Sequence, residues 1–133
     1  MTIDEYEKIA YEDLNFDVTI FKEYCSTLAL KRIKWARFLY QEETISSEAD
    51  ERLKELYKNR LKFYQYDYEY SIDKKYLDIY IRGDKIFQEA EKIYSSQKSK
   101  ESFVREIVAT IDRQSYQMNN VLKHLLWESG VSA

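Results

Sequence analysis

The sequence VREIVATIDRQSYQMNNVLKHL, residues 104–125, decides the fold, because its apolar side chains recur at alternating intervals of four and three. This spacing is typical of a coiled-coil seam, since it brings all members to one face of a helix. We therefore expect a long helix here. The seam comprises Val104, Val108, Ile111, Ser115, Met118, Leu122 and Leu125.

A second apolar flank lies beside this seam, formed by Phe103, Ile107, Tyr116, Val121 and Leu126. A helix that is apolar on two flanks usually packs one face in its own fold and offers the other to a partner, and this partner could be another copy of the chain. The residues predicted for oligomerisation are Val104, Val108, Ile111, Met118, Leu122 and Leu125.

Composition extends the helical prediction to the rest of the chain. The 133 residues, of 16.2 kDa, are 44% apolar and 34% charged, which suits one folded domain. Proline is absent and glycine occurs only at Gly83 and Gly130, so little interrupts a helix. We predict a mainly α fold of long amphipathic helices in a single domain, residues 1–133. Its N-terminal part, 1–82, contains the basic helix, and its C-terminal part, 83–133, serves packing and oligomerisation.

Apolar spacing and capping residues set the expected boundaries. One helix is predicted over about 18–42, capped by Asp17 or Thr19, and a second begins after Ser46 and Ser47. Asp84 is the expected N-cap of a further helix. Over 65–82, tyrosines alternate with polar residues, which leaves a small β-hairpin open. The polar stretch 95–100 is either a loop or an exposed turn of one longer helix.

Charge is distributed unevenly, although 21 basic and 24 acidic residues give a formal net charge of only −3. Bases collect at 28–40 and 52–62. Lys54, Lys58 and Lys62 lie four residues apart and share one helix face, which is either a solvated surface or a track for a nucleic-acid backbone. The alternating tyrosines, Tyr66, Tyr68 and Tyr70, are candidates for base stacking, but the intervening acids oppose phosphate.

The sequence offers little for catalysis. His124 is the only histidine and lies on an apolar helix, and Cys25, the only cysteine, has no partner for a nucleophilic pair or a disulfide. No glycine loop suits a phosphate, and no set of thiolates suits zinc. We expect a protein that is not an enzyme and has no cofactor. An acidic N-terminal segment and the lack of a long apolar run predict neither secretion nor a membrane span.

Four short motifs occur in order along the chain. They are Lys34-Trp35, the Lys-x-Arg-Leu-x-aromatic-Tyr run of residues 58–64, Gly83-Asp84, and the stretch 111–130. In this order and spacing the chain resembles the UvsY family, the recombination mediators of tailed phages. The register is nearly gapless over 1–64 and 83–130, so the likeness covers most of the chain.

The resemblance implies a protein that binds single-stranded DNA and acts in phage DNA recombination, repair and replication. It implies that the chain helps a phage recombinase nucleate on DNA covered by the phage single-strand-binding protein. It also implies an open ring, a homo-hexamer or homo-heptamer, in the cytoplasm of the infected bacterial host, with the C-terminal helix important for assembly.

By this likeness Lys58 and Arg60 occupy the positions of the family's DNA-contacting pair. Together with the basic runs, the predicted DNA-binding residues are Lys31, Lys34, Lys54, Lys58, Arg60 and Lys62. Two departures from the family are visible: Gln65-Tyr66-Asp67-Tyr68 replaces a glycine-containing loop, and the family's basic pattern near the end is lost at 114–119.

The alternative is a helical self-assembling adaptor or scaffold protein without DNA binding, whose basic runs only increase its solubility. A regulator that binds double-stranded DNA is less consistent with the sequence, since no helix-turn-helix spacing with a turn glycine is apparent.

Overall fold

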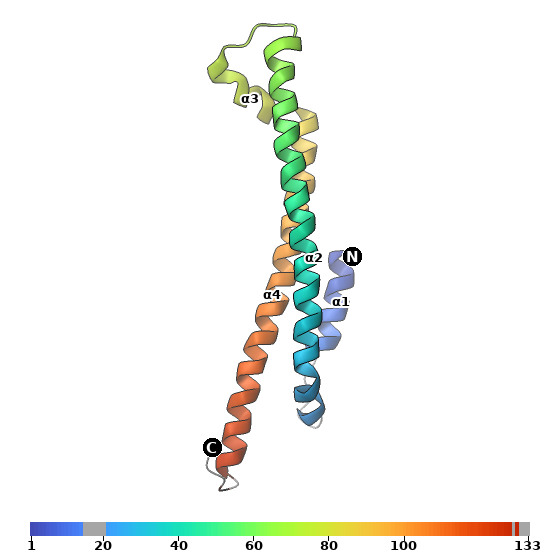
Figure 1. Cartoon of the computed structure of the whole chain (residues 1–133), viewed down its shortest axis with the longest axis vertical. Helices are drawn as coiled ribbons and strands as arrows, with labels where there is room; N and C mark the ends of the chain where they lie inside the picture. Colours follow the sequence, from blue (N-terminus) through green and yellow to red (C-terminus); the bar gives the residue numbers. More distant parts are fainter. Residues whose placement is uncertain (15–20, 129, 131–133) are drawn as a thin grey trace. The chain divides into compact units, whose positions relative to one another are not determined.

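The computed structural model describes residues 1–14, 21–128 and 130 of the chain. The helices are α1 (Ile3–Leu14), α2 (Phe21–Lys62), α3 (Leu77–Arg82) and α4 (Lys85–Glu128), with a π-helical turn, η2 (Phe63–Asp67), and a 3-10 turn, η3 (Lys74–Tyr76). Figure 1 shows them in sequence colours. No strand occurs within the described ranges, so the predicted mainly α fold is confirmed. The expected caps Asp17 and Thr19 lie outside the described residues.

The chain forms two compact units. Unit 1 comprises Met1–Gln41 and Ser102–Ala133, and unit 2 comprises Glu42–Glu101. Each unit therefore contains part of α2 and part of α4, and each unites residues that are distant in the sequence.

The core of unit 1 packs α1 and the second half of α4 against the first half of α2 (Figure 1). Trp35 and Val104 are fully buried, and Tyr6 and Ile111 are nearly so. The Trp35 ring lies 5.1 Å from that of Phe38 at 90°, an edge-to-face arrangement that aromatic pairs favour. The apolar side chains of the first half of α2 thus lie at the centre of this core.

Polar contacts fix both ends of α1. Thr2 and Glu5 form a capping box, each side chain accepting a hydrogen bond from the other's backbone N–H at 3.2 Å. At the other end, Asp13 accepts a hydrogen bond of 2.8 Å from the Trp35 indole N–H. The buried tryptophan is therefore satisfied by a carboxylate from α1, which ties this short helix to α2.

Unit 2 places α3 and the first half of α4 against the second half of α2. Its buried apolar side chains are Leu77, Ile81 and Phe87. The Tyr57 hydroxyl donates a hydrogen bond of 2.6 Å to Asp78, and its ring lies 5.7 Å from that of Phe87. The short helix α3 is therefore held in unit 2 by buried apolar side chains and by the hydrogen bond from Tyr57 to Asp78.

The predicted helix break at Ser46 and Ser47 is wrong, because α2 continues through both residues. Ser46 is buried beside Glu42, and Gln97 of α4 donates hydrogen bonds to the Glu42 carboxylate at 2.8 Å and to the Ser46 hydroxyl at 3.4 Å. The small polar side chain thus serves a contact between helices rather than a cap. Residues 95–100 belong to α4, so the exposed-turn alternative is the correct one.

The hairpin left open for 65–82 is also wrong. Residues 63–67 continue α2 as the π-helical turn η2, which contains Tyr66, and residues 77–82 make the short helix α3. Leu77 and Ile81 lie four residues apart and are both buried, so this segment follows a helical period. Tertiary contacts with α2 outweigh the local preference for strand.

The seam of α4 divides into two parts. Val104, Val108, Ile111 and Met118 are buried in the core of their own unit, whereas the Leu122 side chain is 49% exposed. The side chain of Leu125 lies outside what the structure describes. The first part of the seam therefore packs α4 within the chain, and further apolar side chains are exposed near the end of the helix: Tyr116, Val121 and Trp127.

Ile111→Ala should lower the free energy of unfolding by about 2–5 kcal/mol, because it opens a cavity in the core of unit 1. Leu30→Ala, at a position that is 68% exposed, is the matched control and should change it by less than about 0.5 kcal/mol. Urea denaturation followed by far-UV circular dichroism measures both. Equal losses in the two variants would contradict this core assignment.

Candidate nucleic-acid interface

The second basic run lies on the last three turns of α2, in unit 2. Lys54, Lys58 and Lys62 follow each other at intervals of four and are all exposed, so they form one row along the helix. Among the residues that the structure describes, Lys58 and Lys62 have no hydrogen-bond or ion-pair partner. Their ammonium groups are therefore available to a ligand.

Lys54 has an intramolecular partner. Its ammonium group lies 2.9 Å from the Asp50 carboxylate, one turn earlier, and the hydrogen bond to Asp50 raises the pKa of Lys54. Both groups are solvent-accessible, and exposed pairs of this kind contribute little to stability. A phosphate can replace Asp50 at small cost.

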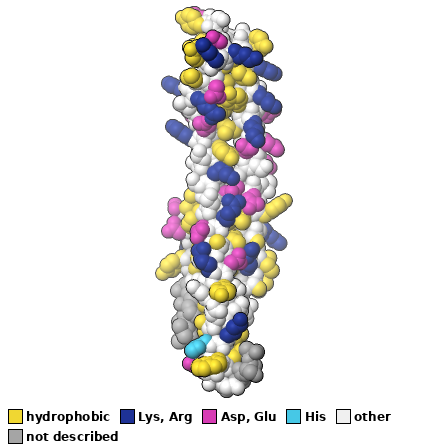
Figure 2. All heavy atoms as spheres, turned by 90° about the vertical axis from the view of Figure 1, so that its left-hand side faces the viewer, with side chains coloured by type: hydrophobic (Ala, Val, Ile, Leu, Met, Phe, Trp, Pro, Cys, Tyr) yellow, Lys and Arg dark blue, Asp and Glu magenta, His cyan; other side chains and the backbone are white. Residues whose placement is uncertain are grey.

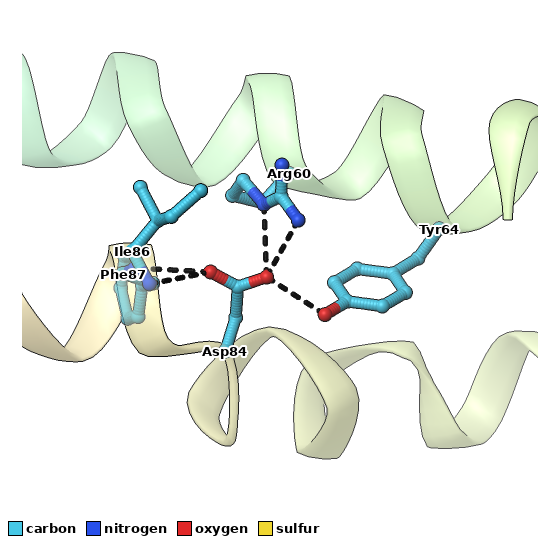
Figure 3. A network of polar contacts seen from close by, with 5 residues as sticks. All are labelled: Arg60, Tyr64, Asp84, Ile86 and Phe87. Atoms are coloured by element: carbon cyan, nitrogen blue, oxygen red, sulfur yellow. Dashed lines mark hydrogen bonds and ion pairs between the residues drawn. The ribbon is translucent and has the colours of Figure 1, made fainter.

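Arg60 is placed differently, since its guanidinium is held by Asp84 (Figure 3). Its Nε and Nη2 atoms donate to the same carboxylate oxygen at 3.0 and 2.6 Å, and the Tyr64 hydroxyl donates to that oxygen at 2.7 Å. The Arg60 side chain is only 18% exposed and that of Asp84 only 5%. The guanidinium also lies over the Phe63 ring, 4.3 Å from its centre.

The other oxygen of Asp84 caps α4. It accepts hydrogen bonds from the backbone N–H groups of Ile86 at 2.9 Å and Phe87 at 3.1 Å, as Figure 3 shows. The predicted N-cap is thus confirmed, and one carboxylate joins the end of α2 to the start of α4 within unit 2. A negative charge at this position also complements the positive end of the α4 dipole.

The pKa values of this group of residues reflect its satisfied hydrogen bonds. Burial by itself would raise the pKa of Asp84, but the hydrogen bonds from Tyr64, Phe87 and Arg60 lower it below its ordinary value. Burial disfavours the charge of Arg60 as well, yet the hydrogen bonds with Asp84 and Tyr64 raise the pKa of Arg60. Both charges are therefore stabilised in the folded chain.

The first basic run lies in unit 1 and is engaged with α1. Lys34 forms an ion pair of 2.6 Å with Asp13, and Lys31 donates to the Asp13 backbone carbonyl at 3.1 Å. Arg32 pairs with Asp112 at 2.8 Å. The structure thus gives Lys31 and Lys34 contacts within the chain, whereas Lys58 and Lys62 of the row in unit 2 are free among the described residues.

Tyrosines surround the end of the basic row. Of the three predicted stacking residues, Tyr66 and Tyr70 are well exposed, and Tyr68 is half-buried between neighbouring rings. At the top of Figure 2, dark blue Lys and Arg side chains lie close to yellow hydrophobic ones, with acids interspersed. Sequence reasoning missed Tyr80, which α3 adds to this group: its ring lies 6.0 Å from that of Tyr68.

Other chemical groups are not assembled into a site. His124 is exposed, 3.1 Å from Glu128 and stacked on Trp127. Within the described ranges, no cluster of three or more His, Cys, Asp or Glu side chains has the arrangement of a metal site. No helix among those residues has the length and apolar character needed to cross a bilayer.

The sequence matches no known protein family and no curated protein. Its fold, in contrast, is that of a phage recombination mediator. One solved structure that it matches is the recombination mediator protein UvsY of bacteriophage T4, with a TM-score of 0.82, 13% sequence identity, and coverage of 96% of this chain and 99% of that chain. The resemblance stated from the sequence is confirmed in the fold.

Asp84→Asn should destabilise the chain by about 3 kcal/mol at neutral pH, because the partly buried Arg60 guanidinium loses its charge partner. Asp84 has a lowered pKa, so it contributes stability above its ordinary pKa of 3.8, and this contribution is lost as the pH falls through the lowered value. The free energy of unfolding of the variant should therefore fall less than that of the native chain as the pH is lowered. Thermal unfolding between pH 2 and 7 measures both effects.

The matched control is Asp73→Asn, which removes an exposed carboxylate 4.0 Å from Lys75. It should shift stability by less than about 0.5 kcal/mol and leave the acid profile unchanged. If Asp84→Asn gives the same profile as this control, the carboxylate does not stabilise unit 2.

Proposed function

We propose that this chain is a recombination mediator that binds single-stranded DNA and helps load a phage strand-exchange recombinase onto DNA covered by a single-strand-binding protein. The observation that carries the proposal is the match of nearly the whole chain to the fold of the T4 recombination mediator. The exposed lysine row of unit 2, in which Lys58 and Lys62 are free among the described residues, is the proposed surface for phosphates. The proposed role requires no catalytic group.

In this proposal the DNA-binding residues have two roles. Lys58, Lys62 and, after release from Asp50, Lys54 neutralise phosphates and release counterions. Arg60 contributes mainly by position, because its ion pair with Asp84 fixes the end of α2 that carries these lysines. Lys31 and Lys34 are assigned supporting contacts, which require exchange of their Asp13 interactions.

Two or three phosphate contacts provide little affinity in one copy of the chain. A homo-hexamer or homo-heptamer would repeat them, and a strand that reaches several subunits would gain avidity by orders of magnitude. The conformation of a strand held in this way would bind the single-strand-binding protein less well and the recombinase better. The chain would thus shift the population of DNA from one protein to the other without catalysis.

The exposed apolar side chains near the end of α4 are the proposed association surface. Val121, Leu122 and Trp127 are all exposed in the single chain and lie in the last two turns of α4, and exposed large apolar side chains commonly mark an interface. The earlier seam residues Val104, Val108, Ile111 and Met118 support this surface from the core of unit 1.

Lys58→Ala combined with Lys62→Ala should weaken binding to a labelled oligo(dT) and reduce its salt dependence. For a single strand, each lost phosphate contact lowers the slope of log K against log salt by about 0.7. Fluorescence anisotropy over a series of salt concentrations measures affinity and slope. Both lysines are exposed and free within the described residues, so the fold and the assembly mass should not change.

The charge-matched control is Lys8→Ala combined with Lys123→Ala, two exposed positions of unit 1. It removes the same charge and should leave the slope nearly unchanged. If both double variants bind like the native chain, the lysine row is not the DNA site.

A self-assembling adaptor without DNA binding is the second candidate, favoured by the apolar end of α4. Both functions require association, so Val121→Ser combined with Leu122→Ser should reduce the mass of the assembly, measured by light scattering. Ile93→Ser, at another exposed apolar position, is the control and should leave the mass unchanged. If the double serine variant loses both assembly mass and oligo(dT) binding, the result supports the mediator. A native chain that assembles but does not bind oligo(dT) supports the adaptor.

A further inference from the structure

Aromatic rings are concentrated around Tyr68, beyond the end of α2. The Tyr68 ring centre lies 5.1 Å from that of Tyr64 and 6.0 Å from those of Tyr70 and Tyr80. Tyr64 and Tyr68 are half-buried and form the inner layer. Tyr70 and Tyr80 form the outer layer and are 65% and 42% exposed.

Tyr66 extends the lysine row. It follows Lys62 by four residues, as Lys62 follows Lys58, and all three side chains are exposed. Tyr66 is 80% exposed, and within the described ranges its ring contacts no other ring and its hydroxyl has no partner. A ring with open faces therefore comes directly after two free ammonium groups.

Large exposed apolar patches commonly mark binding sites, and three exposed tyrosines present flat π faces. Bases of an unpaired strand stack on rings of this kind without regard to sequence. In a duplex the same faces are covered by neighbouring base pairs, so a double strand does not fit this surface.

The acids between the tyrosines divide the surface by charge. Asp67 and Glu69 are exposed, and among the described residues neither has a partner. They repel phosphates but not the uncharged bases, whereas Lys58 and Lys62 attract phosphates. The charge pattern that argues against a phosphate track at the tyrosines is therefore compatible with bases stacked there.

We propose that Tyr66, Tyr70 and Tyr80, the tyrosine patch, stack the bases of a single-stranded nucleic acid whose backbone follows Lys58 and Lys62. This proposal rests on the proposed function and specifies which part of the strand meets which residues. The half-buried rings of Tyr64 and Tyr68 support two members of the patch, since Tyr68 contacts Tyr70 and Tyr80 and Tyr64 contacts Tyr80.

The test replaces the two most exposed tyrosines with a side chain that is apolar but cannot stack. Tyr66→Leu combined with Tyr70→Leu should weaken oligo(dT) binding by about 5- to 150-fold for each base that loses its ring. The salt dependence should stay native, because the lysines are intact. Tyr66→Phe combined with Tyr70→Phe should bind like the native chain, since the rings remain. Circular dichroism establishes that each variant is folded.

A second arm removes the bases instead of the rings. An abasic oligonucleotide of the same length should bind the native chain at least as weakly as oligo(dT) binds the Leu variant, which keeps Tyr80. The Leu variant should bind the abasic strand no more weakly than the native chain does. Native affinity of the Leu variant for oligo(dT), or failure of the Phe variant to restore binding, overturns the stacking proposal.

Two outcomes separate this proposal from those before it. If the native chain binds no oligo(dT) even in dilute buffer, the proposed function itself fails. If the Leu variant changes the mass of the assembly but not its affinity for DNA, the tyrosine patch is an interface between copies of the chain, and stacking is refuted.

Discussion

Unit 2 depends on the hydrogen bonds and the ion pair that the carboxylate of Asp84 forms. One of its oxygens accepts hydrogen bonds from Arg60 and Tyr64 near the end of α2, and the other accepts hydrogen bonds from two backbone N–H groups at the start of α4. A buried charge is tolerated only when its hydrogen-bonding capacity is satisfied, and here four groups satisfy it. The same contacts hold the end of α2 that carries the free lysines.

This constraint separates two kinds of basic residue that look alike in the sequence. Arg60 lies two residues from both Lys58 and Lys62, yet its guanidinium faces a buried acid while they face solvent. A planar fork with several donors suits a fixed carboxylate, whereas a flexible ammonium suits phosphates that vary in position. The proposed interface therefore combines a fixed arginine with mobile lysines.

Much of the fold was predictable from local patterns. The helix over residues 104–125 and the cap at Asp84 depend on neighbours within a few residues, and both are present in the structure. The missed features depend on distant residues. Ser46 resembles a cap but lies inside α2 because Gln97 of α4 provides its partner, and Tyr80 joins the tyrosines only because α3 folds against them.

The sequence by itself determined that the chain forms long helices, where one of them begins, and that a row of lysines shares a face, because helical period and capping are local properties. Only the tertiary structure decided that Arg60 is paired while Lys58 and Lys62 are free, and that the first seam residues are buried within the chain while Leu122 is exposed. Pairing and burial depend on which side chains meet across helices, and one helix alone does not specify its neighbours.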